Sequence, residues 1–290
     1  MKILLTGAGG FVGQRFAAYN KDRFQIQPLS LRNNDWKNTS FEGFDVVVHL
    51  AGKAHEMGKI DDSIYYQVNT ELTKELFQRA AAAGIKQFIY ISSTKVFGDQ
   101  TDGVLTETSP CNPNDAYGKS KLEAEQFLLN QQGSCSVAIV RPPLVYGPGV
   151  KGNMISLLEL AARKVPLPFK GIDNRRSMVF VDNLVELINA IIDKKAAGIF
   201  VAGDRRPLST AELVQLIRGA MNRKPGMFRL PGFLKAIIRK FRPGLYIRLF
   251  GSYEVNPENS FQRLAFTPPY STEQGIRQMV NWYLTESTKK

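Results

Sequence analysis

A glycine-rich segment close to the N-terminus constrains the fold more than any other feature of this sequence. An apolar run, Lys2–Thr6, leads directly into Gly7-Ala8-Gly9-Gly10-Phe11-Val12-Gly13, and a helical pattern follows. Glycines with this spacing allow a tight turn, bring backbone amides close to a pyrophosphate and let the helix pack tightly on the strand, with its positive end facing the negative charge. We therefore predict a dinucleotide-binding loop formed by Gly7, Gly10, Phe11, Val12 and Gly13, against the alternative of an incidental turn.

Short apolar runs alternate with helical patterns through the first half of the chain. This alternation is typical of a parallel sheet whose strands are joined by crossover helices, and strands buried on both faces should be apolar along most of their length. We predict an α/β fold with a Rossmann-like doubly wound parallel sheet. The expected strands are Lys2–Thr6, Phe24–Leu29, Val46–Leu50, Gln87–Ser92 and Val137–Arg141, and the clearest helices are Gly13–Asn20, Thr70–Ala83 and Ala116–Gln131.

The pattern changes after about residue 145, where glycine and proline interrupt the chain more often. Short expected strands near Ser177–Val181 and Gly198–Val201 suggest that two lobes share segments. We predict a dinucleotide-binding domain over 1–150, with added segments near 177–202, and a smaller C-terminal substrate-binding lobe over 151–290, with a soft boundary. The expected helices of this half are Ile155–Arg163, Leu184–Asp193, Thr210–Met221 and Ser271–Tyr283.

Composition excludes several classes of protein. Only two cysteines, Cys111 and Cys135, occur, without metal-ligand spacing, which predicts free thiols in a reducing compartment and no metal site. No apolar stretch reaches the roughly 18 residues that a spanning helix needs, and the first apolar run is too short for a signal peptide. We therefore expect a cytoplasmic protein.

A net charge of +12 and an isoelectric point near 9.7 predict an anionic partner. The basic residues concentrate between Arg223 and Arg248, where Phe and Ile recur at helical spacing. This segment fits either a helix of the second lobe with a solvated basic face, which we favour, or an amphipathic helix in weak contact with a membrane surface. We expect no nucleic-acid partner, because no DNA- or RNA-binding motif accompanies the charge.

The end of the second expected strand bears on the choice of nicotinamide cofactor. An acidic residue there would accept hydrogen bonds from the adenosine ribose, which favours NAD(H). Here Ser30 occupies that place and Arg32 follows, and a guanidinium can instead hold a 2′-phosphate. We predict that Arg32 binds the cofactor and favours NADP(H); NAD(H) is the alternative, with Arg32 as a solvated loop residue.

Ser93, Tyr117 and Lys121 are the candidate catalytic residues. Ser93 follows an expected strand, and the carboxyl ends of parallel strands face the ligand crevice. Tyr117 and Lys121 lie on one face of an expected helix. A phenol with an ordinary pKa of about 10 is a poor acid–base catalyst at neutral pH, but a nearby ammonium and a positive nicotinamide ring would stabilise its phenolate. We predict that Tyr117 exchanges the proton, Ser93 binds the reacting oxygen and Lys121 holds the nicotinamide ribose.

Together these motifs closely resemble the extended short-chain dehydrogenase/reductase family, in its NAD-dependent epimerase/dehydratase branch. The resemblance covers nearly the full chain, through Thr6-Gly7-x-x-Gly10-x-x-Gly13, His49-Leu50-Ala51-Gly52, Val68-Asn69, Ser92-Ser93, Tyr117-x-x-x-Lys121 and Arg141-Pro142-Pro143-Leu144. It implies the catalytic roles already given. It also implies that the cofactor channel is lined by Leu50, Ala51, Gly52, Asn69, Ile91, Tyr117, Lys121, Pro142 and Leu144.

The resemblance extends to the substrate. Arg176 matches the family segment whose arginine holds a nucleotide diphosphate, and Asn153 and Arg248 are further candidates, with Ser93 at the sugar. Similar relatives of bacterial surface-polysaccharide synthesis, including O-antigen, imply a UDP-sugar as substrate. Many relatives are homodimers with a four-helix interface, which here would use Thr70–Ala83 and Ala116–Gln131.

Two reactions at sugar C4 remain open. A 4-keto reductase would consume NAD(P)H to make a 6-deoxy-N-acetylhexosamine nucleotide, whereas a UDP-glucose/UDP-galactose-type 4-epimerase would retain its NAD. The missing acid near Ser30 favours the reductase, and Thr94-Lys95 in place of an Asp-Glu pair disfavours a dehydratase. A non-catalytic dinucleotide sensor is the alternative from another class; the intact catalytic residues argue against it.

Overall fold

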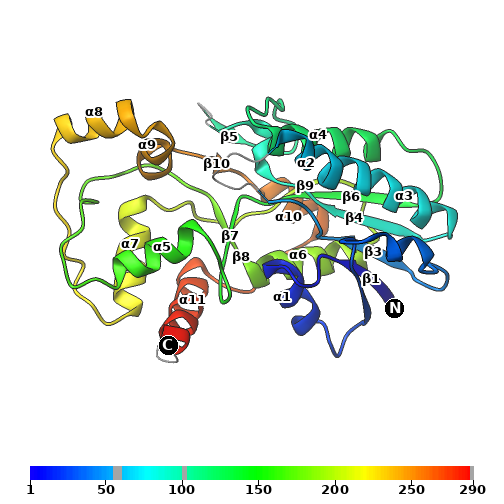
Figure 1. The fold of residues 1–290 in the computed structure, drawn as a ribbon. Coiled ribbons are helices and arrows are strands. Elements are labelled where there is room, and N and C mark those ends of the chain that lie inside the picture. The colour runs from blue at the N-terminus through cyan, green and yellow to red at the C-terminus, as the bar shows by residue number, and fades with distance from the viewer. Residues whose placement is uncertain (55–60, 100–102, 288–290) are drawn as a thin grey trace.

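A six-stranded parallel sheet forms the centre of the larger lobe (Figure 1). The computed structural model describes residues 1–54, 61–99 and 103–287. The strand order is β2-β1-β3-β4-β6-β9, so the direction of winding reverses beside β1, where doubly wound sheets bind their ligands. The predicted fold class is therefore confirmed. The strands are β1 (Lys2–Thr6), β2 (Gln25–Leu29), β3 (Val46–His49), β4 (Gln87–Ile91), β6 (Ser136–Arg141) and β9 (Gly198–Val201).

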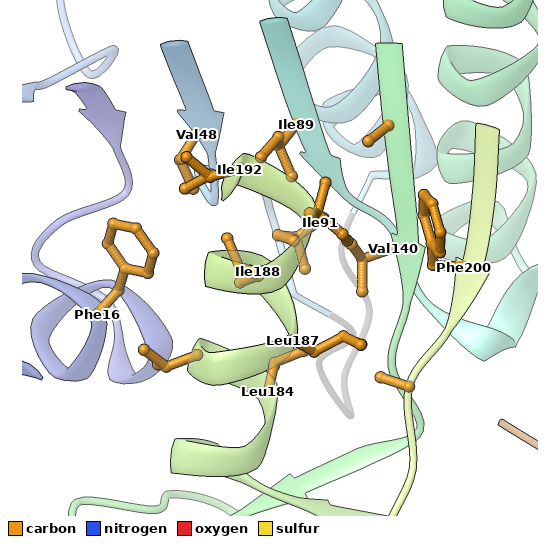
Figure 2. Close-up of a cluster of buried hydrophobic side chains, with 14 of the residues drawn as sticks. Phe16, Val48, Ile89, Ile91, Val140, Leu184, Leu187, Ile188, Ile192 and Phe200 are labelled. Atoms are coloured by element: carbon orange, nitrogen blue, oxygen red, sulfur yellow. The ribbon is translucent and has the colours of Figure 1, made fainter. Parts of the chain in front are cut away.

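Helices cover both faces of the sheet (Figure 1). On one face, α6 (Val181–Asp193) places Leu184, Leu187, Ile188 and Ile192 against the apolar side chains of the central strands, as Figure 2 shows. Each such side chain contributes about 1.5–3 kcal/mol when fully buried. The same face is covered by α1 (Phe11–Tyr19) and α10 (Glu258–Leu264), and the other face by α3 (Leu72–Ala82) and α4 (Ala116–Leu129).

One strand differs from the sequence-based expectation. β2 is mostly exposed, with only Leu29 buried, although it was expected to be buried on both faces. It is the edge strand and pairs with β1 alone in this sheet, so one side of its backbone has no neighbouring strand in the described sheet. Pro28, which has no N–H to offer a further strand, suits such an edge.

Helix boundaries differ by a few residues from those expected. α1 begins at Phe11 because Gly10, in extended conformation, is its N-cap. The helix expected from Thr70 starts earlier, as α2 (Asp62–Tyr65) followed by a π-helical stretch (η2, Tyr66–Glu71) that runs into α3. Asp115 caps α4, its carboxylate accepting a hydrogen bond from the Gly118 amide at 2.7 Å.

The smaller lobe lies beside the carboxyl ends of the sheet strands and is built largely from the second half of the chain. Its core joins the parallel pair β7 (Leu144–Tyr146) and β8 (Met178–Phe180) to α5 (Asn153–Ala161), α7 (Thr210–Ala220) and α11 (Thr272–Ser287). A helix pair, α8 (Gly232–Phe241) and α9 (Pro243–Phe250), projects at its outer edge (Figure 1). Short strands β5 (Val104–Leu105) and β10 (Glu254–Val255) pair in parallel, so segments distant in the sequence meet between the lobes. Among the described helices, none has the length and apolar character needed to cross a bilayer.

Candidate active site

The turn from β1 into α1 depends on two glycines, Gly7 in the loop and Gly13 in the first turn of α1. Gly7 has φ +70°, and a Cβ there would lie 2.5 Å from the amide nitrogen of Ala51. A Cβ on Gly13 would lie 2.1 Å from the Gly7 carbonyl oxygen. The Gly10 amide donates to the same oxygen at 2.9 Å, which closes the turn. The open N-terminus of α1 beyond this turn, with no acidic residue in its first turn, suits the phosphates of a dinucleotide.

Asn69, in the π-helical stretch η2, connects the loop after β3 to α4. Its Oδ1 accepts from the Lys53 amide at 2.8 Å, and its Nδ2 donates to the Ser120 hydroxyl at 3.0 Å. A Cβ on Gly52 would lie 3.0 Å from the Asn69 oxygen and 3.2 Å from Lys121 Nζ. The absence of a side chain at Gly52 therefore lets the loop after β3 approach the candidate catalytic lysine.

His49 links the end of β1 to the start of α3 through a hydrogen bond at each of its ring nitrogens. Its Nδ1 lies 2.6 Å from the Thr6 hydroxyl and its Nε2 lies 2.9 Å from the Thr73 hydroxyl. Because Thr6 Oγ1 also accepts from the Ala51 amide and Thr73 donates to the Asn69 carbonyl, the hydroxyl roles assign the ring proton to Nε2. Burial, and secondarily the charge of Lys121, lowers the pKa of His49 to about 3, so the ring stays neutral.

The structure brings Ser93, Tyr117 and Lys121 together. Ser93 starts the short 3₁₀ helix η3 (Thr94–Phe97), and its hydroxyl accepts from the Lys95 amide at 3.2 Å. The Ser93 side chain lies near enough to the Tyr117 hydroxyl to act on its pKa. Gly118 allows this approach, since a Cβ there would lie 2.7 Å from the Lys95 carbonyl oxygen.

Burial sets the protonation of the two titrating groups. It raises the pKa of Tyr117, while the nearby Ser93 side chain works in the opposite direction. It lowers the pKa of Lys121 to about 8, against the attraction of Glu125. Lys121 Nζ donates to the Ile91 carbonyl oxygen at 2.9 Å and lies 4.6 Å from the centre of the Tyr90 ring. An added charge beside this partly buried phenol would shift the Tyr117 pKa.

Sequence reasoning missed a buried ion pair next to Lys121. Arg141, at the end of β6, binds Glu125 on α4 with Nη2–Oε2 at 2.5 Å and Nε–Oε1 at 3.1 Å. Both side chains are almost fully buried. Glu125 lies one turn after Lys121 but is neutralised by Arg141, so the lysine remains available for another partner. Glu125 lies on a helix and Arg141 on the next strand, so no spacing along the sequence indicates that they pair.

The three predicted substrate residues also come together, although they lie on three separate elements. Arg248 on α9 donates to Asn153 Oδ1 at the start of α5, at 3.4 Å. Arg176 donates Nη1 to the carbonyl oxygens of Ile247 and Gly251 at 3.2 and 3.1 Å. Burial, and also the neighbouring charge of Arg248, lowers the pKa of Arg176. Two close guanidinium groups at a helix N-terminus favour an anion between them.

The remaining predicted residues differ in exposure. Arg32 is exposed just beyond β2, with its amide 3.5 Å from the Ser30 hydroxyl. Leu144 is 47% exposed at the start of β7. Pro142 is buried, and its carbonyl oxygen accepts from the Thr94 amide at 3.0 Å. In the described part of the chain, no group of three or more His, Cys, Asp or Glu side chains is placed to hold a metal.

Comparison with known proteins decides the family. The model of the "NAD dependent epimerase/dehydratase family" matches residues 3–203. The chain belongs to this family. It is therefore an enzyme of the NAD-dependent epimerase/dehydratase type, and the resemblance found in the sequence is confirmed. A UDP-glucose 4-epimerase of Vibrio cholerae is 34% identical over 99% of this chain and 97% of its own length.

A second relative and two solved structures are also similar to this chain. An N-acetyl-alpha-D-glucosaminyl-diphospho-ditrans,octacis-undecaprenol 4-epimerase of Escherichia coli O157:H7 is 28% identical over 99% of this epimerase/dehydratase chain and 96% of its own. Among solved structures, RMD from Pseudomonas aeruginosa, complexed with NADPH, has a TM-score of 0.80 at 20% identity, covering 98% and 99% of the two chains. UDP-glucuronic acid 4-epimerase from Bacillus cereus, in complex with NAD, has a TM-score of 0.78 at 19% identity, covering 97% and 96%. At these identities the structures establish the shared fold.

Proposed function

We propose that this chain catalyses NADP(H)-dependent reduction of a UDP-4-keto-6-deoxy-N-acetylhexosamine at C4, for surface polysaccharide. The observation that carries the proposal is the placement of Ser93 near the Tyr117 hydroxyl, with Lys121 on the next turn of α4. A hydroxyl pair beside a buried ammonium suits proton exchange with a single sugar oxygen. This arrangement also argues against the non-catalytic sensor.

The glycine turn before α1 and the polar contacts of Asn69 fit a nicotinamide dinucleotide. Gly7 and Gly13 let the turn close tightly before the N-terminus of α1, and Gly52 lets the loop after β3 approach Lys121. When bound, the dinucleotide supplies or takes up hydride, and its oxidised ring adds a positive charge. We assign Arg32 to a 2′-phosphate because Ser30 and Arg32, both exposed, follow β2 where an acid would bind a free ribose hydroxyl.

The protein's own groups handle the proton. Tyr117 donates its hydroxyl proton to the C4 oxygen when the ketone is reduced, and Ser93 holds that oxygen in place. Lys121, with its pKa lowered to about 8, is still largely charged at neutral pH and stabilises the phenolate that remains. The diphosphate of the nucleotide sugar would lie between Arg176 and Arg248, at the N-terminus of α5.

Retention of NAD with 4-epimerisation is the second candidate function. It is favoured by the two relatives described above, both of which carry 4-epimerase names. The same three catalytic residues serve both reactions, because each moves hydride and a proton at C4. The two functions differ in their substrate and in whether the reduced cofactor is consumed.

One experiment separates them. The purified protein is mixed with UDP-4-keto-6-deoxy-N-acetylglucosamine and either NADPH or NADH, and the absorbance of the reduced nicotinamide is followed. Stoichiometric consumption, faster with NADPH, is expected. Interconversion of UDP-glucose and UDP-galactose without added reductant, together with no consumption in the first tube, would establish the epimerase. Equal use of NADH and NADPH would remove the assignment of Arg32.

We also propose that the chain is a cytoplasmic homodimer that pairs α3 and α4 of one subunit with those of its partner. Light scattering at increasing protein concentration tests the dimer, and a mass of one chain throughout would exclude it.

A further inference from the structure

The helix pair α8–α9 is unlike the other helices of the smaller lobe. Each of α5, α7 and α11 places several buried side chains in the core, whereas no described side chain in α8 or α9 is buried. Large apolar groups are instead open to solvent. We call four of them the apolar stripe: Phe233 (66% exposed), Ile237 (48%), Phe241 (69%) and Leu245 (45%).

The apolar stripe faces away from the protein. Phe233, Ile237 and Phe241 are spaced four residues apart, which places them along one side of α8. On another side, Lys235 Nζ lies 5.2 Å from the centre of the Phe250 ring, and this contact holds α8 against α9. The outer edge of the lobe thus presents large aromatic and aliphatic side chains to solvent.

The basic residues around the apolar stripe indicate which kind of partner covers it. Between Glu212 and Glu254 the sequence has no acidic residue and nine basic ones. Within α8, Arg239 and Lys240 are exposed beside the apolar stripe, and Arg242 follows. A helix with aromatic side chains on one face and Lys or Arg around them binds at the interface of a bilayer that carries anionic lipids. A symmetric contact with a second copy would instead place this basic surface against itself.

We propose that α8 and α9 dock on the surface of an anionic bilayer, with the apolar stripe inserted at the headgroup boundary. The docked helices are attached to the candidate diphosphate site, since Arg248 belongs to α9 and the carbonyl oxygen of Ile247 on α9 holds Arg176. The docking itself does not depend on the proposed function. If that function holds, docking brings the diphosphate site to the membrane surface.

Sedimentation with vesicles tests the docking. The full-length protein should bind vesicles of phosphatidylglycerol and phosphatidylcholine, bind pure phosphatidylcholine vesicles much less, and lose binding as salt is raised. Phe233→Ser/Phe241→Ser should weaken binding to the mixed vesicles by about tenfold or more, because transfer of one aromatic ring out of water is worth about a factor of ten. Val165→Ser, a change at a residue that is 52% exposed outside the helix pair, should have no effect.

A charge-reversal variant tests the basic residues beside the apolar stripe. Arg239→Glu/Lys240→Glu should remove the preference for anionic vesicles, whereas Lys21→Glu/Lys194→Glu, at exposed positions on the larger lobe, should keep most of it. Absence of binding by the wild type, or undiminished binding by the Phe233→Ser/Phe241→Ser variant, would overturn the proposal. Self-association lost in that variant, without vesicle binding by the wild type, would show that a second copy covers the stripe. Vesicle binding needs no turnover, so its failure is distinguishable from failure of the proposed reaction.

Discussion

Burial acts on Tyr117 and Lys121 in opposite directions. It raises the pKa of the phenol and lowers that of the ammonium, so it disfavours the charged form of each. The protein holds Lys121 out of water and Tyr117 partly out of water even though this costs stability, and such perturbed groups concentrate at functional sites. The nearby Ser93 side chain partly offsets the effect on Tyr117.

Tyr117→Phe should lower kcat by about 10²–10⁴-fold, because the variant has no proton to exchange with the C4 oxygen. The ring itself stays, packed edge-on against Tyr65 at 6.1 Å between ring centres, so the fold should be kept. Steady-state kinetics and circular dichroism measure the two effects. Tyr19→Phe is the matched control, since that hydroxyl donates to Glu186 outside the crevice. Unchanged turnover in Tyr117→Phe would remove the catalytic assignment.

Lys121→Met should raise the free energy of unfolding at neutral pH while it abolishes turnover. The lysine has a pKa of about 8 when folded and an ordinary value of 10.5. Between these pH values the unfolded chain binds more protons, so the wild type gains stability as the pH rises and the charge is no longer buried. The variant also loses the hydrogen bond to the Ile91 carbonyl oxygen, which reduces the gain. The free energy of unfolding of the variant should therefore exceed that of the wild type by about 2 kcal/mol near pH 7.

That advantage should shrink as the pH approaches 10, and denaturant unfolding at several pH values measures it. Lys119→Met, at an exposed position on the same helix, should change stability by less than about 0.5 kcal/mol throughout. A difference between wild type and Lys121→Met that does not vary with pH would contradict the burial argument.

At the scale of elements, the turn between β1 and α1 depends on space that only glycine leaves. Gly13→Ala should destabilise the fold by about 3 kcal/mol or more, because its Cβ would lie 2.1 Å from the Gly7 carbonyl oxygen and the backbone must move. Gly9→Ala is the matched control for stability, since its Cβ would meet nothing within 4 Å. Thermal unfolding gives the comparison, and titration with NADPH should show that Gly13→Ala no longer binds the cofactor. Equal melting temperatures would show that the loop can relax.

Sequence reasoning found the features that depend on neighbours along the chain. The glycine loop and the Tyr117–Lys121 spacing are local, and a single sequence displays them. The exposure of β2 was missed because strand order is set by pairing between distant segments, and nothing in Gln25–Leu29 marks it as an edge except Pro28. The Arg141–Glu125 pair was missed for the same reason. The family resemblance supplied Arg176, which composition and spacing could not have picked out.

At the scale of the whole molecule, the larger lobe is not built from one continuous segment. α6 and β9, which follow residue 180, complete one face and one edge of the sheet (Figure 2). Asp182 on α6, almost fully buried, binds Arg15 on α1 with Nη2–Oδ2 at 2.6 Å. The order of elements along the chain therefore differs from their order in space.

A fragment that ends at residue 150 should not fold cooperatively. It would expose the apolar side chains of Val48, Ile89, Ile91 and Val140 that α6 covers, and leave β6 without its neighbour β9. Thermal melting by circular dichroism should show no sharp transition, in contrast to the full chain. A sharp transition in the fragment would show that the first 150 residues form a domain without the segments near 177–202.

The late position of α6 also shapes how the protein is made. On the ribosome, the strands β1, β3, β4 and β6 are synthesised before the helix α6 that covers them, so the growing chain carries an open apolar sheet face until α6 has been made. Such a face is a binding surface for chaperones that recognise exposed apolar segments, and a starting point for aggregation when they are scarce. The yield of folded enzyme should therefore depend on the supply of chaperones during synthesis more than on the stability of the finished molecule.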